Sequence, residues 1–152
     1  MNISKEVWFP INLCVDYKMN PGHVDGSIHL ISEKSVDDLR RRVNEHSDVV
    51  VEPYQFKPNI VVEGVEAYEE DYMKQMVIGD DNTVSLTITK PCMRCKNTAY
   101  IYNKGKFDSY MEPFTTLREY RQRGPKGDAP FSMYASADTE GYINVGDTVR
   151  YS

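Results

Sequence analysis

The apolar positions of residues 35–46 recur every three to four residues, which is the spacing of one face of a helix. These positions are Val36, Leu39 and Val43. Ser35 is the expected N-cap, because its hydroxyl can accept hydrogen bonds from the first unpaired backbone N–H groups. Two aspartates in the next turn suit the positive end of the helix dipole. A second, shorter helix is predicted over residues 116–123.

Other segments have the short or alternating patterns of β-strands. Residues 49–51 and 59–65 are rich in Val and Ile, as buried strands are. In residues 83–90 apolar side chains alternate with Ser and Thr, and residues 100–107 read as a hairpin. Residues 141–151 read as strand, tight turn and strand. Many short strands with one or two helices predict a mainly β domain, a β-barrel with a few short helices as decoration.

Composition narrows the class of protein. The 152 residues fit one ordinary domain, and 40% hydrophobic with 27% charged residues is usual for a globular protein. The net charge of −5 argues against non-specific nucleic-acid binding. Three cysteines make a poor disulfide framework, so a reducing compartment is expected. The first ten residues lack the pattern of a secretory signal, and no stretch approaches the roughly 18 apolar residues of a spanning helix.

Cys92 and Cys95 are the first candidates for chemistry, because two thiols three residues apart support several kinds of site. A structural zinc site would need further ligands at irregular spacing. The candidates are Cys14, His23, His29 and His46. A thioredoxin-like pair would need a helix after the first thiol, whereas residues 96–102 read as a strand. Two buried thiols that only pack are the third interpretation, and the pair alone leaves all three open.

Six short motifs surround this pair in a fixed order. They are FKPNIVV at 56–62, AYEEDY at 67–72, IGD at 78–80, KPCMRC at 90–95, EPFTTLREYR at 112–121 and GYINVGD at 141–147. Their order and spacing resemble the MOSC domain, the C-terminal domain of molybdenum-cofactor sulfurases. The resemblance covers residues 29–149. It is strongest to the subgroup that contains the mitochondrial amidoxime-reducing component and its bacterial relatives.

The resemblance implies a set of site residues. Cys95 matches the family's molybdenum ligand and is therefore the expected catalytic and metal-binding residue. A soft thiolate suits molybdenum, and the adjacent cation Arg94 favours the thiolate form and is expected to help bind the cofactor. Asn59 matches a residue that hydrogen-bonds the pterin. Lys57 stands in place of a family arginine, so it keeps the charge but loses the bidentate fork. Thr98 matches a family Thr that follows the ligand and could support it, but an ordinary strand residue is the favoured interpretation.

The implied function is that of an oxidoreductase, or its cofactor-binding half, that carries the molybdenum cofactor (molybdopterin) and reduces N-hydroxylated substrates. Electrons would come from a protein of the cytochrome b5 or ferredoxin type. Two alternatives remain: a non-reducing cofactor or sulfur carrier module, and a degenerate structural domain without cofactor. Pyridoxal phosphate binding is a further property that the resemblance implies.

This sequence departs from the family pattern at three points. Met93 stands where the reductases often have Ser, and the pair Phe131-Ser132 stands where Phe-Gly is usual. The chain is expected to be a single MOSC domain over residues 1–152 that lacks the N-terminal β-barrel region of the reductases. We therefore expect a cytoplasmic or other reducing intracellular location, with mitochondrial association only through a segment not present here.

Overall fold

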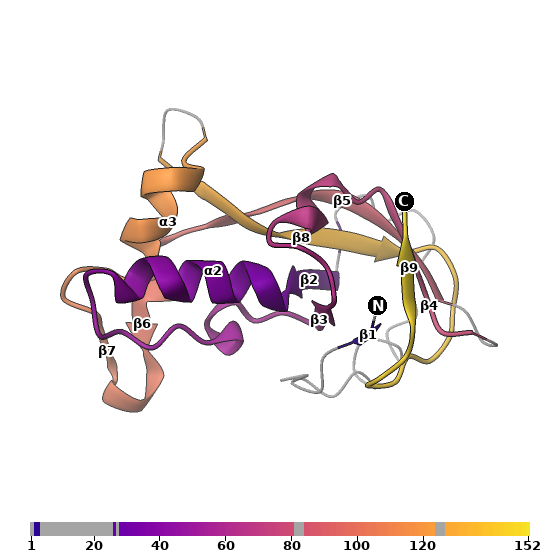
Figure 1. Cartoon of the computed structure of the whole chain (residues 1–152), viewed down its shortest axis with the longest axis horizontal. Helices are drawn as coiled ribbons and strands as arrows, with labels where there is room; N and C mark the ends of the chain where they lie inside the picture. The colour runs from indigo at the N-terminus through magenta and orange to yellow at the C-terminus, as the bar shows by residue number, and fades with distance from the viewer. Residues whose placement is uncertain (1, 4–25, 27, 81–83, 124–126) are drawn as a thin grey trace.

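A computed structural model describes residues 2–3, 26, 28–80, 84–123 and 127–152, and one strongly curved, nearly closed sheet dominates it (Figure 1). The strands lie in the order β1 (Asn2–Ile3), β3 (Ile60–Glu63), β2 (Ile28–Ser32), β8 (Ala129–Ala137), β5 (Val84–Arg94), β4 (Gln75–Ile78) and β9 (Val149–Tyr151). The β2–β3 pair is parallel, and the other pairs are antiparallel. Strands β6 (Tyr100–Ile101) and β7 (Lys106–Phe107) form a separate small hairpin. The expectation of a mainly β fold is confirmed.

Within the described ranges two α-helices pack against this sheet: α2 (Glu33–Asn44) and α3 (Phe114–Arg121). The described part of the chain also contains four 3-10 helices in its connections: η1 (Pro53–Phe56), η2 (Glu69–Tyr72), η3 (Lys96–Ala99) and η4 (Tyr102–Lys104). No helix among the described residues has the length and apolar character needed to cross a membrane.

The N-cap of α2 is Ser32, and the expectation that Ser35 would cap this helix is wrong. Ser32 ends β2 in an extended conformation, so its hydroxyl accepts from the Ser35 N–H at 3.0 Å. Ser35 already lies in the helix, and its hydroxyl donates to the buried carboxylate of Glu70 at 2.9 Å. Glu70 also accepts from the Ser32 N–H at 3.2 Å. The start of α2 is therefore fixed by a strand-end serine and a carboxylate from η2.

The sheet buries apolar side chains on both of its faces. On β2, Leu30 packs in one cluster with Ile60, Val62 and other strand residues. Its neighbour Ile31 points to the other face. There it joins a second cluster that also contains the apolar residues of α2 and α3. Because helices cover one face and the curved sheet encloses the other, all five residues of β2 are buried.

Strand β5 carries the candidate site at its end, and it is longer than the predicted segment 83–90. The register shifts between Ile88 and Lys90 and again between Pro91 and Met93, where the strand pairs with β8. Such irregularities accommodate Pro91 within a ladder. The cysteine motif was expected after this strand, but its first residues lie within the strand. Cys92 and Arg94 point to the buried side, and Met93 is exposed.

Three local expectations were wrong. Residues 49–51 form no strand, although Val51 is buried against α2 and its neighbours. Residues 96–99 are a 3-10 helix, and residues 141–146 contain a turn but no strand. These segments do not pair in the sheet, and a sequence pattern alone does not distinguish a strand from a segment that is buried by packing. The Gly and Pro content of residues 124–130 favours a loop; residues 124–126 lie outside the described residues, and Ala129 and Pro130 begin β8.

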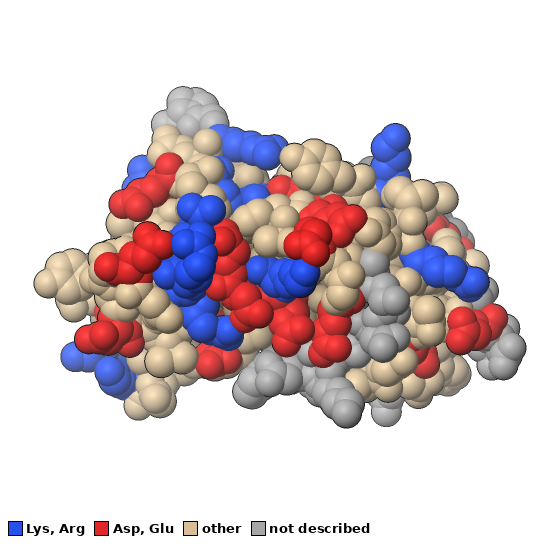
Figure 2. Space-filling view, in the orientation of Figure 1, with Lys and Arg blue, Asp and Glu red and all other residues tan. Residues whose placement is uncertain are grey.

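The outer face of α2 carries acidic and basic side chains side by side (Figure 2). Asp38 pairs with Arg42 at 2.7 Å and with Arg41 at 2.8 Å. Partial burial opposes ionisation of Asp38. Hydrogen bonds from Arg42, Arg41 and Tyr68 outweigh it and lower its pKa to about 2. The run of three arginines is therefore a paired, largely solvated face of the helix.

Candidate functional site

A cavity of about 360 Å³ lies at the end of β5, between that strand, η1 and the β6–β7 hairpin. Its described lining residues are Gln55, Phe56, Lys57, Cys92, Met93, Arg94, Cys95, Asn97, Thr98, Tyr100, Tyr102, Phe107 and Tyr134. The volume lies within the range of small-molecule sites. None of these lining residues is acidic, although the whole chain has a net charge of −5. The cavity is therefore a locally cationic site in an acidic protein.

Arg94 supplies the buried positive charge of this cavity and is only 9% exposed. Its Nε donates to the Phe131 carbonyl at 3.0 Å, and its Nη1 donates to the Phe56 carbonyl at 3.0 Å. Its Nη2 contacts the Ser132 hydroxyl and the His29 ring. All four partners are neutral, and none of the described contacts of Arg94 is with a carboxylate. The N–H donors of Arg94 are therefore hydrogen-bonded, but none of these partners compensates its positive charge.

His29 has a single tautomer that fits its contacts. A guanidinium can only donate, so the Nε2 atom that faces Arg94 must accept. The proton therefore sits on Nδ1, which donates to the Lys57 carbonyl at 3.0 Å. Burial, and secondly the charge of Arg94, lower the pKa of His29 to about 3. A neutral His29 thus links the backbone of Lys57 to the side chain of Arg94, the two cationic residues of the cavity.

Ser132 has a backbone conformation that is unusual for a residue with a side chain. Its φ is 79°, in the left-handed region that favours glycine. Its side chain is buried, and its hydroxyl contacts both Arg94 and His29. The departure from Phe-Gly noted in the sequence therefore places a hydroxyl against the buried cation.

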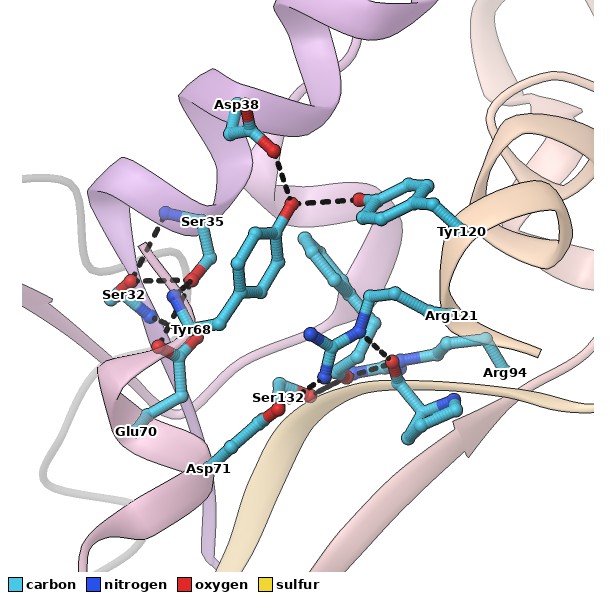
Figure 3. A network of polar contacts seen from close by, with 12 residues as sticks. Ser32, Ser35, Asp38, Tyr68, Glu70, Asp71, Arg94, Tyr120, Arg121 and Ser132 are labelled. Carbon is cyan, nitrogen blue, oxygen red and sulfur yellow. Dashed lines mark hydrogen bonds and ion pairs between the residues drawn. The ribbon is translucent and has the colours of Figure 1, made fainter. Parts of the chain in front are cut away.

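A network of aromatic and polar contacts supports the start of β8 beneath this cluster (Figure 3). Arg121 of α3 donates to the Pro130 carbonyl at 2.6 Å and to Asp71 at 2.5 Å. Its guanidinium lies 4.4 Å from the ring centre of Tyr68, which in turn packs against Phe131. The backbone that presents Phe131 and Ser132 to Arg94 is thus held by α3 and η2 together.

The two cysteines differ in exposure. Cys92 is buried and Cys95 is exposed, and both thiols are free. The Thr98 hydroxyl donates to the Cys95 carbonyl at 3.0 Å, which fixes the backbone just after β5. Thr98 was expected to be a strand residue but lies in η3. Among the described residues, no group of three His, Cys, Asp or Glu side chains could hold a metal ion, so nothing there completes a zinc site with the Cys pair. Cys14 and His23 lie outside the described residues.

The sequence-predicted site residues are distributed as follows. Lys57, Arg94 and Cys95 line the same cavity, approaching it from η1 and β5. Asn59 is not one of the described lining residues. Its Oδ1 accepts from the His29 N–H at 2.7 Å, and its own N–H donates to the His29 carbonyl at 2.7 Å. His29 was considered in the sequence as a possible further zinc ligand, and its contact with Arg94 was not predicted. Alternate side chains of β5 point inward, and this alternation was the signal in the sequence that Arg94 would be buried and would need hydrogen-bond acceptors.

Fold and cavity together describe a mainly β domain with a free thiol in a cationic pocket, and comparison with known proteins identifies its family. The MOSC domain model matches residues 18–150. This chain belongs to the MOSC domain family.

Three curated relatives illustrate the similarity. Mitochondrial amidoxime reducing component 2 of Rattus norvegicus is 38% identical over 128 residues, which cover 80% of this chain and 36% of the relative. Mitochondrial amidoxime-reducing component 1 of Homo sapiens is 36% identical over 126 residues, which cover 79% of this chain and 35% of the relative. Molybdenum cofactor sulfurase of Arabidopsis thaliana is 35% identical over 117 residues, which cover 72% of this chain and 14% of the relative. The chain thus spans about a third of the reducing components and a smaller part of the sulfurase.

Proposed function

We propose that this domain binds the molybdenum cofactor in the Cys95 cavity and forms the cofactor-binding part of an oxidoreductase for N-hydroxylated compounds. The observation that carries the proposal is the uncompensated buried charge of Arg94 beside an exposed thiol. A soft thiolate is a suitable ligand for molybdenum. Anionic phosphate groups are bound by cations and N–H donors in water-poor sites. The donor set of the cavity therefore fits a metal cofactor that carries an anionic tail.

Each residue has a stated role in this proposal. Cys95 supplies the thiolate to the metal, while Lys57 and Arg94 hold the anionic part of the cofactor. The resemblance assigns Asn59 to the pterin. That part of the proposal requires its amide NH₂ group to reach the ligand, since Oδ1 already accepts from His29. His29 and Ser132 keep the Arg94 guanidinium in place and contribute no charge.

When bound, the cofactor would supply two-electron redox chemistry at the metal. The overall reaction converts an N–OH group, two electrons and two protons into N–H and water. The electrons would come from a donor protein of the cytochrome b5 or ferredoxin type. Two free thiols are consistent with a reducing intracellular compartment, cytoplasmic or mitochondrial.

The second candidate is a non-reducing module that carries the cofactor or its sulfur. The similarity to a molybdenum cofactor sulfurase favours it. A domain without cofactor is the third candidate. Pyridoxal phosphate has less support, because its Schiff base would need Lys57, the only lysine among the described lining residues, and the proposal above already assigns that side chain to the anionic part of the molybdenum cofactor.

The test is cofactor loading in two matched variants, purified from a host that makes the molybdenum cofactor. Cys95→Ser is expected to lose most of its bound molybdenum and pterin, because a hydroxyl is a poor soft-metal ligand at neutral pH. Cys92→Ser removes a buried thiol from the same strand end and is expected to keep most of both. Equal loss of cofactor in the two variants would contradict the proposal. It would also be contradicted if neither the unaltered chain nor a longer chain that includes the upstream region of the relatives contained any cofactor.

A reductase assay separates the first candidate from the second. Benzamidoxime and a reconstituted electron chain are supplied to the cofactor-loaded protein, and benzamidine formation is measured. Loaded protein that forms no benzamidine with either type of donor would favour the carrier role.

A further inference from the structure

The β6–β7 hairpin carries three aromatic side chains on one face. Tyr100 and Phe107 are directly paired across the hairpin, and their ring centres are 5.2 Å apart. Tyr102 lies two residues after Tyr100, and its ring is 5.2 Å from that of Tyr100. Both contacts are edge-to-face, a favourable geometry for aromatic pairs. The three rings therefore form a continuous surface, which we call the aromatic face.

The aromatic face is tied to the body of the domain and not only to itself. Tyr102 contacts Tyr54 of η1, with ring centres 6.3 Å apart. The Asp108 N–H donates to the Ala99 carbonyl at 2.8 Å, which closes the base of the hairpin against η3. An isolated two-stranded hairpin is marginally stable, so these contacts fix its position beside the cavity.

All three residues of the aromatic face line the cavity that contains Cys95. Tyr102 is 50% exposed and Phe107 is 42% exposed, so packing within the hairpin leaves much of each side chain uncovered. An edge-to-face contact uses the face of one ring and only the edge of the other, so ring surface remains for a further partner. Large apolar side chains that are half exposed inside a concave site are typical of ligand recognition.

We propose that the aromatic face of Tyr100, Tyr102 and Phe107 binds a planar aromatic ring of the ligand next to Cys95, and so selects aromatic over aliphatic ligands. The proposal rests on the proposed function, because it places that ring in the cofactor pocket and names the class of substrate. A planar ring could belong to the substrate or to the pterin, and stacking on tyrosine and phenylalanine is the chemistry common to both.

The primary experiment compares two ligands of similar size on the cofactor-free full chain. Benzamidoxime has a planar ring, and cyclohexanecarboxamidoxime has a puckered, saturated one. Dissociation constants from NMR titration are expected to favour benzamidoxime by about 3- to 10-fold, which is the typical contribution of one aromatic pair. Equal constants for the two ligands would overturn the proposal.

Matched variants locate the effect. Tyr102→Leu and Phe107→Leu are expected to abolish the preference, whereas Tyr102→Phe, which keeps the ring, is expected to retain it. Tyr142→Leu is the control, because Tyr142 is 69% exposed and is not one of the described lining residues. Circular dichroism checks that each variant is folded. A preference that persists in both leucine variants, or that is lost equally in the control, would refute the assignment.

Two further arms identify the source of the ring and separate this proposal from the proposed function. Free 6-hydroxymethylpterin that binds in a Tyr102-dependent manner supports the aromatic face and assigns it to the cofactor. Binding of benzamidoxime alone supports it and assigns it to the substrate. These titrations need no redox turnover. A loaded protein without reductase activity but with the ring preference would overturn only the proposed reaction, and an active reductase without the preference would overturn only this inference.

Discussion

Ser132 offers a direct test of how the cavity is built, because two effects oppose each other at this residue. Its hydroxyl contacts the buried guanidinium of Arg94, which favours serine. Its φ of 79° favours glycine. Ser132→Ala removes the hydroxyl and keeps the unfavourable conformation. Ser132→Gly removes the hydroxyl and relieves that conformation.

The magnitudes predict an order of stability. A buried hydrogen bond to a charged group contributes about 1.5–3 kcal/mol, and both variants lose it. A left-handed conformation costs a non-glycine residue about 1–2 kcal/mol, which glycine regains. The greater freedom of glycine in the unfolded chain offsets about 0.5–1 kcal/mol of this gain. Ser132→Ala should therefore lose about 1.5–3 kcal/mol relative to the unaltered protein, and Ser132→Gly should lose about 1 kcal/mol less.

The free energy of unfolding of the three proteins can be measured by urea denaturation followed by circular dichroism, with the slopes of the transitions compared. Equal slopes would show that the three proteins expose the same amount of surface on unfolding, so that differences in midpoint report differences in stability. A glycine variant that is less stable than the alanine variant would refute the strain argument. An alanine variant as stable as the unaltered protein would refute the role of the hydroxyl in holding Arg94.

Two further predictions concern the helix α2. Asp38 has a folded pKa of about 2, below its ordinary value of 3.8, so it stabilises the fold above about pH 4, and this contribution is lost as the pH falls toward 2. Asp38→Asn should flatten the acid limb of the stability curve in this window, and an unchanged limb would contradict the assignment. Leu39 is fully buried, so Leu39→Ala should lower the free energy of unfolding by about 2–5 kcal/mol in urea. The exposed control Val50→Ala should change it by less than about 0.5 kcal/mol.

Much of the fold could be predicted because its local patterns agree with their tertiary environment. The apolar stripe of α2 faces one core cluster, as the spacing of Val36, Leu39 and Val43 indicates. The first N-cap assignment failed because two serines stand three residues apart, and only the end of β2 decides which hydroxyl faces the helix. The prediction of a strand at Val51 was wrong because this residue is buried in a cluster with residues of α2 and α3 and not by strand pairing.

The candidate site was predictable only in part, since its polar contacts join distant positions. Lys57, Arg94 and Cys95 were named from the resemblance, and they line one cavity. The partners of Arg94 lie 65 residues away at His29 and 38 away at Ser132. Pairing of β2 and β5 with β8 brings these residues together. A sequence pattern records the inward direction of a side chain but not which strand lies opposite.

The neutral surroundings of Arg94 are the strongest physical argument about what the cavity accepts. A structural need for a buried arginine is normally met by a carboxylate, because the pair then compensates its own charge. Here two backbone carbonyls, a hydroxyl and a neutral imidazole satisfy the N–H donors and leave the charge in place. His29 cannot share that charge, because its pKa of about 3 keeps it unprotonated at neutral pH. With Lys57 in the same cavity and no acidic described lining residue, the positive potential acts on whatever lies beside Cys95. An anionic ligand is the partner that such an arrangement stabilises most.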